Sequence, residues 1–212
     1  MKRIMEEILL RWTWNGREQE PFLCSSGDEE ALLRGFLATT GAVDAARIQS
    51  VARDGERWQV ETEGGSDPRA GLEERLERTA TVSSDFRIGT EELENLCSLA
   101  TERDPRFEGL HNVVISDGIR TVTGRDVDRH NALDKAVGKA LQAGMDLSSS
   151  ALGTSGRISV KMFAKAAAAG IPVLATRKQI GSLGIAYGEK LGIAVCRFDD
   201  EPEYYGAAWR VG

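Results

Sequence analysis

The second half of the chain alternates short apolar runs with amphipathic stretches, and this alternation limits the possible folds more than any other feature. In chain order, the runs predict strand 151–153, helix 159–169, strand 171–175, helix 179–191 and strand 193–198. Gly170 and Gly192 end the two helices. This order of elements predicts parallel strands joined by right-handed crossovers, so we expect an α/β domain.

A strand pair and a longer helix precede this alternation. Residues 110–116 and 119–123 predict antiparallel strands around the turn Asp117-Gly118. After Asp128, the apolar residues of 132–141 recur at helical spacing, which indicates a helix with one buried face.

The first half is predicted to be β-rich, with the strong turn Asn15-Gly16 between its first two strands. Its predicted elements are strands 8–14 and 17–24, a helix from Ser26 or Asp28 to about Thr40, a hairpin over 47–61 and a helix over 90–100. We expect residues 63–87 to be a long, mobile connection, and Asp104-Pro105 to lie in a loop. The predicted division is an N-terminal portion over 1–88 and an α/β domain over 89–212.

Composition narrows the class of protein. The net charge of −6 argues against a nucleic-acid-binding surface. Cys24, Cys97 and Cys196 are odd in number and far apart, which fits a reducing compartment, and none forms the C-x-x-C of a zinc site. The chain has neither a signal-peptide pattern nor an apolar run long enough to span a membrane. We therefore expect a cytoplasmic protein with no membrane segment and no bound metal.

Residues 124–135 concentrate charged side chains at the start of the predicted helix. Asp126 or Asp128 can cap the helix by accepting from its free backbone N–H groups. Arg129 and Lys135 can contact phosphate oxygens.

The same helix brings two further pairs together, because residues four apart are neighbours on one face. His130 and Asp134 form one pair, beside the apolar stripe, and Asn131 and Lys135 form the other on the polar face. Two interpretations stay open from the residues alone, which are a capped, solvated helix and a site for a polyanionic ligand.

Residues 154–159 form a second candidate, between a predicted strand and a predicted helix. Gly156 lets a ligand approach the backbone, Ser155 and Ser159 offer hydroxyls, and Arg157 adds a positive charge. An ordinary capped turn is the alternative. Both candidates follow strands, and ligands bind beyond the carboxyl ends of strands in open α/β sheets. A P-loop and the zinc-deaminase motifs are absent from the sequence.

These residues resemble the formate dehydrogenase accessory (FdhD/NarQ) family. The run D-V-D-R-H-N-A-L-D-K at 126–135 is close to that family's D-V-G-R-H-N-A-L-D-K. Further similar runs are S-G-R at 155–157, K-A-A at 165–167, A-G-I-P at 169–172, L-G-I at 191–193 and the segment 27–37. His111, which opens a predicted strand, falls where the family has an H-A-A element.

The resemblance implies a cytidine-deaminase-like three-layer α/β sandwich with a mixed sheet, plus the N-terminal β-rich portion. It also implies a homodimer that helps to mature molybdenum-dependent formate dehydrogenase. Members of the family pass sulfur from a cysteine desulfurase to the bis-guanylyl molybdenum cofactor, which they bind. Their sulfur transfer uses a C-x-x-C on a mobile loop, because a thiol can carry a persulfide and a hydroxyl cannot.

The chain departs from the family at this pair. Thr81 and Ser84 occupy the corresponding positions, so no catalytic residue is expected there. Cys97 lies on a predicted helix and is a poor substitute, and Asp128 stands where the family has Gly.

Three hypotheses follow. The first is a protein that binds the guanylyl molybdenum cofactor or a guanine nucleotide without transferring sulfur. The second is a sulfurtransferase that uses an isolated cysteine or a partner's thiol, and the third is an interaction scaffold with a vestigial site. For the first, the expected binding residues are Asp126, Arg129, His130, Asn131, Asp134, Lys135, Ser155, Gly156, Arg157 and His111. In it, Asp134 would orient His130 or accept from the base.

Overall fold

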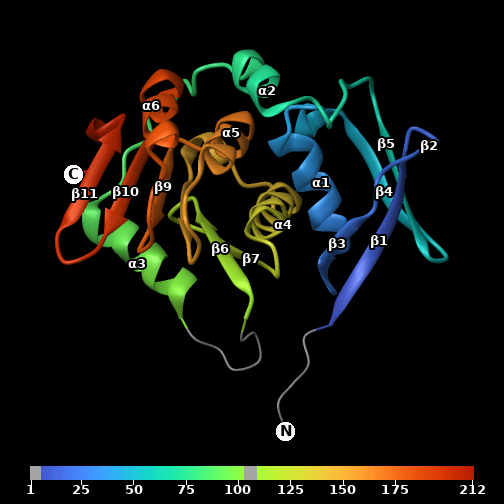
Figure 1. The fold of residues 1–212 in the computed structure, drawn as a ribbon, viewed down its shortest axis with the longest axis horizontal. Helices are drawn as coiled ribbons and strands as arrows, with labels where there is room; N and C mark the ends of the chain where they lie inside the picture. Colours follow the sequence, from blue (N-terminus) through green and yellow to red (C-terminus); the bar gives the residue numbers. More distant parts are fainter. Residues whose placement is uncertain (1–5, 103–108) are drawn as a thin grey trace, which may run out of the picture.

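The fold was analysed in a computed structural model that describes residues 6–102 and 109–212. Two sheets lie on either side of a central pair of helices (Figure 1). The predicted loop through Asp104-Pro105 lies outside the described residues.

A six-stranded mixed sheet forms the larger part of the molecule. Its strands are β6 (His111–Ser116), β7 (Thr121–Asp126), β8 (Ala151–Thr154), β9 (Val173–Thr176), β10 (Ala194–Phe198) and β11 (Pro202–Gly206), in the order β11-β10-β9-β8-β6-β7. The predicted parallel pairing of β8, β9 and β10 is confirmed. β6 runs antiparallel to both of its neighbours, and β11 runs antiparallel to β10.

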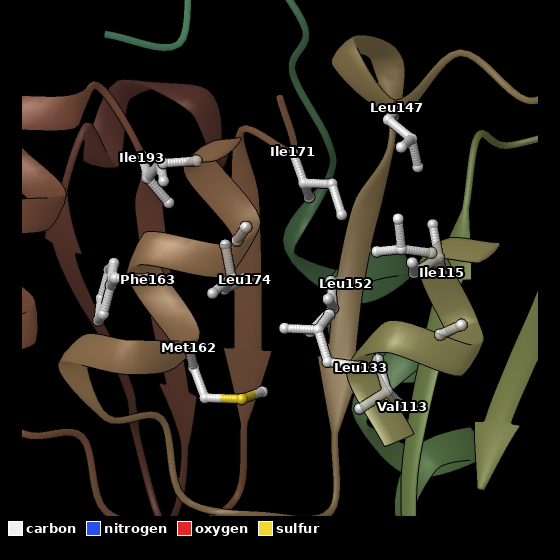
Figure 2. Packing of buried hydrophobic residues seen from close by; sticks show 14 of the residues in the cluster. Val113, Ile115, Leu133, Leu147, Leu152, Met162, Phe163, Ile171, Leu174 and Ile193 are labelled. Carbon is white, nitrogen blue, oxygen red and sulfur yellow. The ribbon is translucent and has the colours of Figure 1, made fainter. Parts of the chain in front are cut away.

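Helices cover both faces of this sheet and so complete the expected three-layer sandwich. One face carries α4 (Arg129–Gln142), α5 (Val160–Ala168) and α6 (Ser182–Leu191), and the other carries α3 (Thr90–Thr101). Alternate residues of each strand point to opposite faces. Ile115 and Leu152 therefore pack with Leu133 and Phe163 of the helices on the first face (Figure 2). Val114 and Cys196 pack against α3 on the second face.

The N-terminal portion is a smaller mixed sheet with one helix. Its elements are β1 (Glu7–Trp14), β2 (Arg17–Glu18), β3 (Phe22–Ser25), α1 (Glu29–Thr39), β4 (Ile48–Asp54) and β5 (Arg57–Thr62). Both predicted hairpins form, and β1 also pairs in parallel with β5, which the local patterns did not predict. Helix α1 packs directly on α4, where the two helices form the central pair (Figure 1).

The long connection is more ordered than its composition predicts. Helix α2 (Leu72–Arg78) interrupts it, and Leu76 of this helix reaches the main core. Residues 79–87 have no regular structure, as expected, but the buried guanidinium of Arg210 donates to three of their carbonyls, at Val82, Ser84 and Phe86. The sequence pattern did not predict α2, and the expected mobility of the connection over 63–87 stays a prediction.

Candidate functional site

The two candidate motifs meet at one edge of the large sheet. β6 is antiparallel to both β7 and β8, so the carboxyl ends of β7 and β8 lie at the same edge. α4 starts just beyond β7, and the turn 155–157 follows β8. His111, the first residue of β6, pairs with Asp126 at the end of β7 and so joins this edge.

Asp128 is the N-cap residue of α4. This confirms one of the two predicted alternatives, which were Asp126 and Asp128. The Asp128 carboxylate accepts from the backbone N–H groups of His130, at 2.7 Å, and Asn131, at 3.2 Å. The same oxygen lies 3.2 Å from Nδ1 of the His130 imidazole. The hydrogen bond with the His130 side chain, and next those from the two backbone N–H groups, hold the pKa of Asp128 well below its usual range. The prediction that His130 pairs with Asp134 is wrong, because its imidazole pairs with Asp128 instead.

Hydroxyl groups at the ends of the strands build the turn around Gly156. Thr154 accepts from the backbone N–H of Gly156, and Thr176 donates to its carbonyl. Ser155 accepts from the backbone N–H of Asn112 on β6 through its hydroxyl, so this hydroxyl fastens the turn to the sheet. The Ser155 hydroxyl was predicted to contact a ligand. Such a contact would compete with this structural hydrogen bond.

Four polar side chains surround His111 at this edge. Arg129, Asp128, His130 and Arg157 all act electrostatically on its imidazole. Burial, and next the charge of Arg129, lower the pKa of His111 below its ordinary value, so the imidazole is neutral at pH 7.

Gly156 keeps a space open between these side chains. A Cβ on Gly156 would lie 3.5 Å from both the Arg129 side chain and Nδ1 of His111. The absent side chain of Gly156 thus leaves room for one atom between the aliphatic part of the Arg129 side chain and the His111 imidazole.

Several buried polar atoms at the edge lack a protein partner. Within the described part of the chain, Nε of Arg129, Nε2 of His130 and Oγ of Ser159 have no hydrogen-bond partner. Ser159 is the N-cap residue of α5, but its side chain makes no capping bond. Buried polar groups are normally satisfied, so such atoms call for a ligand or water.

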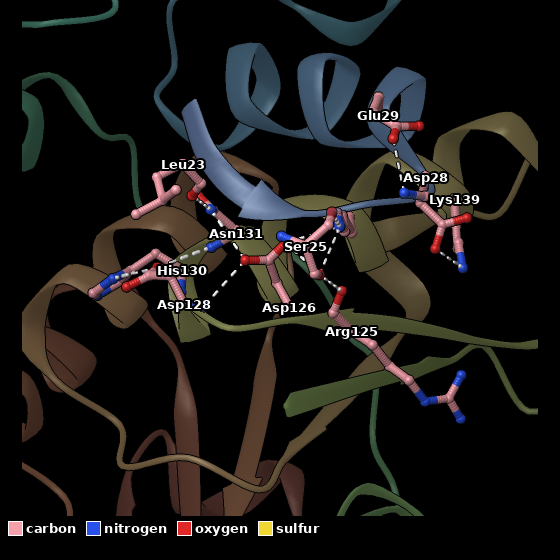
Figure 3. A network of polar contacts seen from close by, with 12 residues as sticks. Leu23, Ser25, Asp28, Glu29, Arg125, Asp126, Asp128, His130, Asn131 and Lys139 are labelled. Carbon is pink, nitrogen blue, oxygen red and sulfur yellow. Dashed lines mark hydrogen bonds and ion pairs between the residues drawn. The ribbon is translucent and has the colours of Figure 1, made fainter. Parts of the chain in front are cut away.

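Several other polar residues of the 126–135 run form internal structural contacts, and Figure 3 shows those of Asp126 and Asn131 with β3. Lys135 is fully buried, and its ammonium lies 2.8 Å from Asp126 and donates to the Ser25 carbonyl of β3. Asn131 donates to the Leu23 carbonyl of the same strand and to Asp126. The expectation that Lys135 meets a phosphate on a polar helix face is wrong, because that face packs against β3.

Asp134 is likewise an internal residue. Its carboxylate pairs with Lys165 of α5 at 2.7 Å and accepts from the hydroxyl of Thr39 on α1. The expectation that it accepts from a base at the edge is therefore wrong. The spacing of residues along a helix does not show which of its polar positions another helix or strand will cover.

Comparisons with known proteins give the same family as the sequence motifs. Residues 73–211 match the model of the FdhD/NarQ family. The chain belongs to the FdhD/NarQ family. The sulfur carrier protein FdhD of Geobacillus kaustophilus (strain HTA426) is 28% identical over 91% of the chain and 82% of that relative. The FdhD protein of Staphylococcus aureus (strain MRSA252) is 27% identical over 87% of the chain and 79% of its own length.

A solved structure supports the fold of this FdhD-family chain over nearly its whole length. The crystal structure of a candidate formate dehydrogenase accessory protein from Desulfotalea psychrophila aligns with a TM-score of 0.85 and 25% identity. The alignment covers 98% of this chain and 90% of that one. Among the residues that the structure describes, no helix is long and apolar enough to cross a membrane.

Thr81 and Ser84, which we expected at the positions of the family's cysteine pair, lie at the opposite edge of the sheet. Ser84 donates to the carbonyl of Ser148, just before β8 begins, and Thr81 donates to that of Lys190 near the end of α6. A cavity of about 610 Å³ beside them is lined by residues such as Arg75 and Asp146. It is separate from the edge that holds His111 and His130.

The three cysteines of this FdhD-family chain are buried among apolar side chains. Cys24 lies in the N-terminal core, and Cys97 and Cys196 lie in the core beneath α3. Burial raises the pKa of Cys24 to about 11 and the pKa values of Cys97 and Cys196 to about 12. They are protonated and inaccessible in the folded state, which is the opposite of a reactive thiol.

Proposed function

We propose that this chain is a formate dehydrogenase accessory protein that binds a guanylyl molybdenum cofactor or a guanine nucleotide and carries no sulfur on its own cysteines. The observation that carries the binding proposal is the set of buried, unpartnered atoms at the His111 edge. Arg129 and His130 supply two of these atoms, and the exposed Arg157 adds a second guanidinium.

The chemistry of this edge fits a phosphorylated ligand. Guanidinium groups form strong, charge-assisted bonds with phosphate oxygens. The start of α5, whose N-cap residue Ser159 makes no side-chain capping bond, adds backbone N–H groups and the positive end of a helix dipole. Arg129, Arg157 and Ser159 would hold phosphates, while the neutral His111 can bond to a hydroxyl or base. Asp126, Asn131, Asp134 and Lys135 would support this edge from inside the protein.

The burial of the cysteines argues for binding without sulfur transfer. A persulfide carrier needs a thiolate that a donor can reach. Among this chain's thiols, burial suppresses both ionisation and access. The hydroxyls of Thr81 and Ser84 cannot replace a thiol in this step.

The proposed partner is a molybdenum-dependent formate dehydrogenase or a related oxidoreductase, since relatives are described as formate dehydrogenase accessory proteins and sulfur carriers. The homodimer that the family resemblance implies is also part of the proposal. Light scattering on the purified protein measures its mass and tests this point directly.

Calorimetric titration with GDP tests the binding site. We expect GDP to bind the wild type, and Arg129→Ala and Arg157→Ala each to weaken binding by roughly 10- to 100-fold, the effect of about 1.5–3 kcal/mol for a charged hydrogen bond. Arg53→Ala is the matched control, because Arg53 is an exposed arginine in the N-terminal sheet and should leave binding unchanged. Equal effects of all three substitutions would contradict the proposed site.

Incubation with a cysteine desulfurase and radiolabelled cysteine tests the second half of the proposal. The folded protein should retain no labelled sulfur, whereas its three cysteines should become reactive toward thiol reagents after unfolding in urea. Stable labelling that disappears when one cysteine is replaced would support a sulfurtransferase instead.

A further inference from the structure

The contact between Asp128 and the His130 imidazole goes beyond what capping of α4 requires. One oxygen of Asp128 accepts both backbone capping bonds and also contacts Nδ1 of the imidazole. This contact places a proton on Nδ1, because a carboxylate oxygen can only accept. Nε2 is then the remaining nitrogen, and it is buried without a partner among the described residues.

We propose that Asp128 positions His130 so that Nε2 takes up a proton when an anion binds beside Arg129 and Arg157. This inference rests on the anion site proposed above and adds its regulation. Neutral imidazole plus one proton from the buffer gives imidazolium, which then donates from Nε2 to the anion. Binding of the anion and binding of the proton therefore strengthen each other.

The surrounding charges explain why a carboxylate is needed. The charged and titratable groups that act on the neighbouring His111 imidazole are Asp128 and Arg129 at the start of α4, His130 itself and Arg157 before α5. Two guanidiniums oppose a further positive charge on an imidazole. Asp128, whose carboxylate lies 3.2 Å from Nδ1 of His130, is the negative group in contact with this ring.

The two histidines differ in this respect. Burial and the charge of Arg129 lower the pKa of His111, and among the described residues no carboxylate forms an ion pair or hydrogen bond with its ring. His130 has Asp128 as a direct partner. His111 therefore stays neutral at the site, while His130 carries the proton that accompanies the anion.

The first experiment reads the imidazole directly. The chain has two histidines, so long-range ¹H–¹⁵N spectra assign both rings with the help of His111→Gln and His130→Gln variants. We expect neutral His130 to carry its proton on Nδ1 in the wild type and mainly on Nε2 in Asp128→Ser. Serine still caps a helix, so α4 keeps its cap while the carboxylate is lost.

Asp44→Ser is the control for the loss of a capping carboxylate. Asp44 caps the short helix at Ala45–Arg47, in the N-terminal portion. This variant should leave both imidazole spectra unchanged. A wild-type His130 with its proton on Nε2 would overturn the positioning role of Asp128.

The second experiment measures GDP binding between about pH 6.5 and pH 8.5, in buffers of different ionisation enthalpy. The wild-type affinity should fall with rising pH, by up to about tenfold per pH unit, which is the limit for one linked proton. Binding should also take up protons from the buffer. His130→Gln keeps only the contribution from titration of GDP itself, so the effect of His130 is the difference between the wild type and this variant. That difference should be strongly reduced in Asp128→Ser.

The outcomes separate this inference from the function on which it rests. Binding of GDP that is equally pH-dependent in the wild type and in His130→Gln overturns proton uptake at His130 but leaves the anion site intact. A wild type that binds no GDP at any of these pH values overturns the anion site and the inference together.

Discussion

His111 is a single residue whose protonation should affect the stability of the whole fold. Its pKa is lowered in the folded protein, so the unfolded chain binds the proton more tightly. The free energy of unfolding should therefore decrease as pH falls through about 6.5, the ordinary pKa of histidine. Urea unfolding of the wild type and His111→Gln at about pH 7.5 and pH 5.5 measures this contribution.

The His111→Gln variant should lose less stability on acidification than the wild type, because glutamine does not titrate. His130→Gln is the matched control, since it removes the other histidine and keeps His111. An equal acid-induced loss in the wild type and His111→Gln would show that His111 does not contribute.

At the scale of elements, the contact between α1 and α4 depends on two glycines. A Cβ on Gly35 would lie 1.8 Å from the carbonyl oxygen of Asp134, and one on Gly138 would lie 1.9 Å from that of Ala31. Distances of this size leave no room for any side chain. The two helices therefore approach each other backbone to backbone.

Gly35→Ala should separate these helices and destabilise the protein by about 1–3 kcal/mol or more, although alanine is intrinsically the better helix former. Denaturant unfolding measures the loss. Gly71→Ala is the control, since a Cβ there meets nothing within 4 Å. A Gly35→Ala protein as stable as the wild type would mean that α1 and α4 can move apart at little cost.

At the scale of the whole molecule, the lysines of two buried ion pairs also donate hydrogen bonds to the N-terminal portion. Lys165 of α5 contacts Asp134 of α4 and donates to Thr39 of α1. Lys135 similarly ties α4 to β3. Removal of one partner from such a pair leaves an uncompensated buried charge.

Lys165→Met should reduce stability by about 3–5 kcal/mol, a large share of the usual 5–15 kcal/mol of a domain. Lys161→Met on the same helix is the control, because Lys161 is exposed. Adding Asp134→Leu to Lys165→Met should recover part of the loss, since an apolar pair leaves no buried charge. Thermal unfolding measures the stability of the three variants. Equal stability of Lys165→Met and Lys161→Met would contradict the predicted cost of an unpaired buried charge.

The sequence by itself determined the order of helices and strands in 110–198 and the parallel core of the large sheet. Apolar periodicity and glycine punctuation are local signals, and they decide local structure. The same signals placed the two motifs at strand ends, and therefore at one edge. The parallel pairing of β1 with β5 has no such signal, because it joins segments far apart in the chain.

Only the tertiary structure separated the two roles within residues 126–135. Asp128, Arg129 and His130 lie at the open edge, whereas Lys135 and Asp134 are covered by elements from the N-terminal portion and α5. Spacing along a helix shows which side chains share a face, but burial depends on what packs against that face. One half of the charged run thus forms the proposed ligand site and the other half supports the interior of the protein. This division arises from the packing of β3, α1 and α5 on α4.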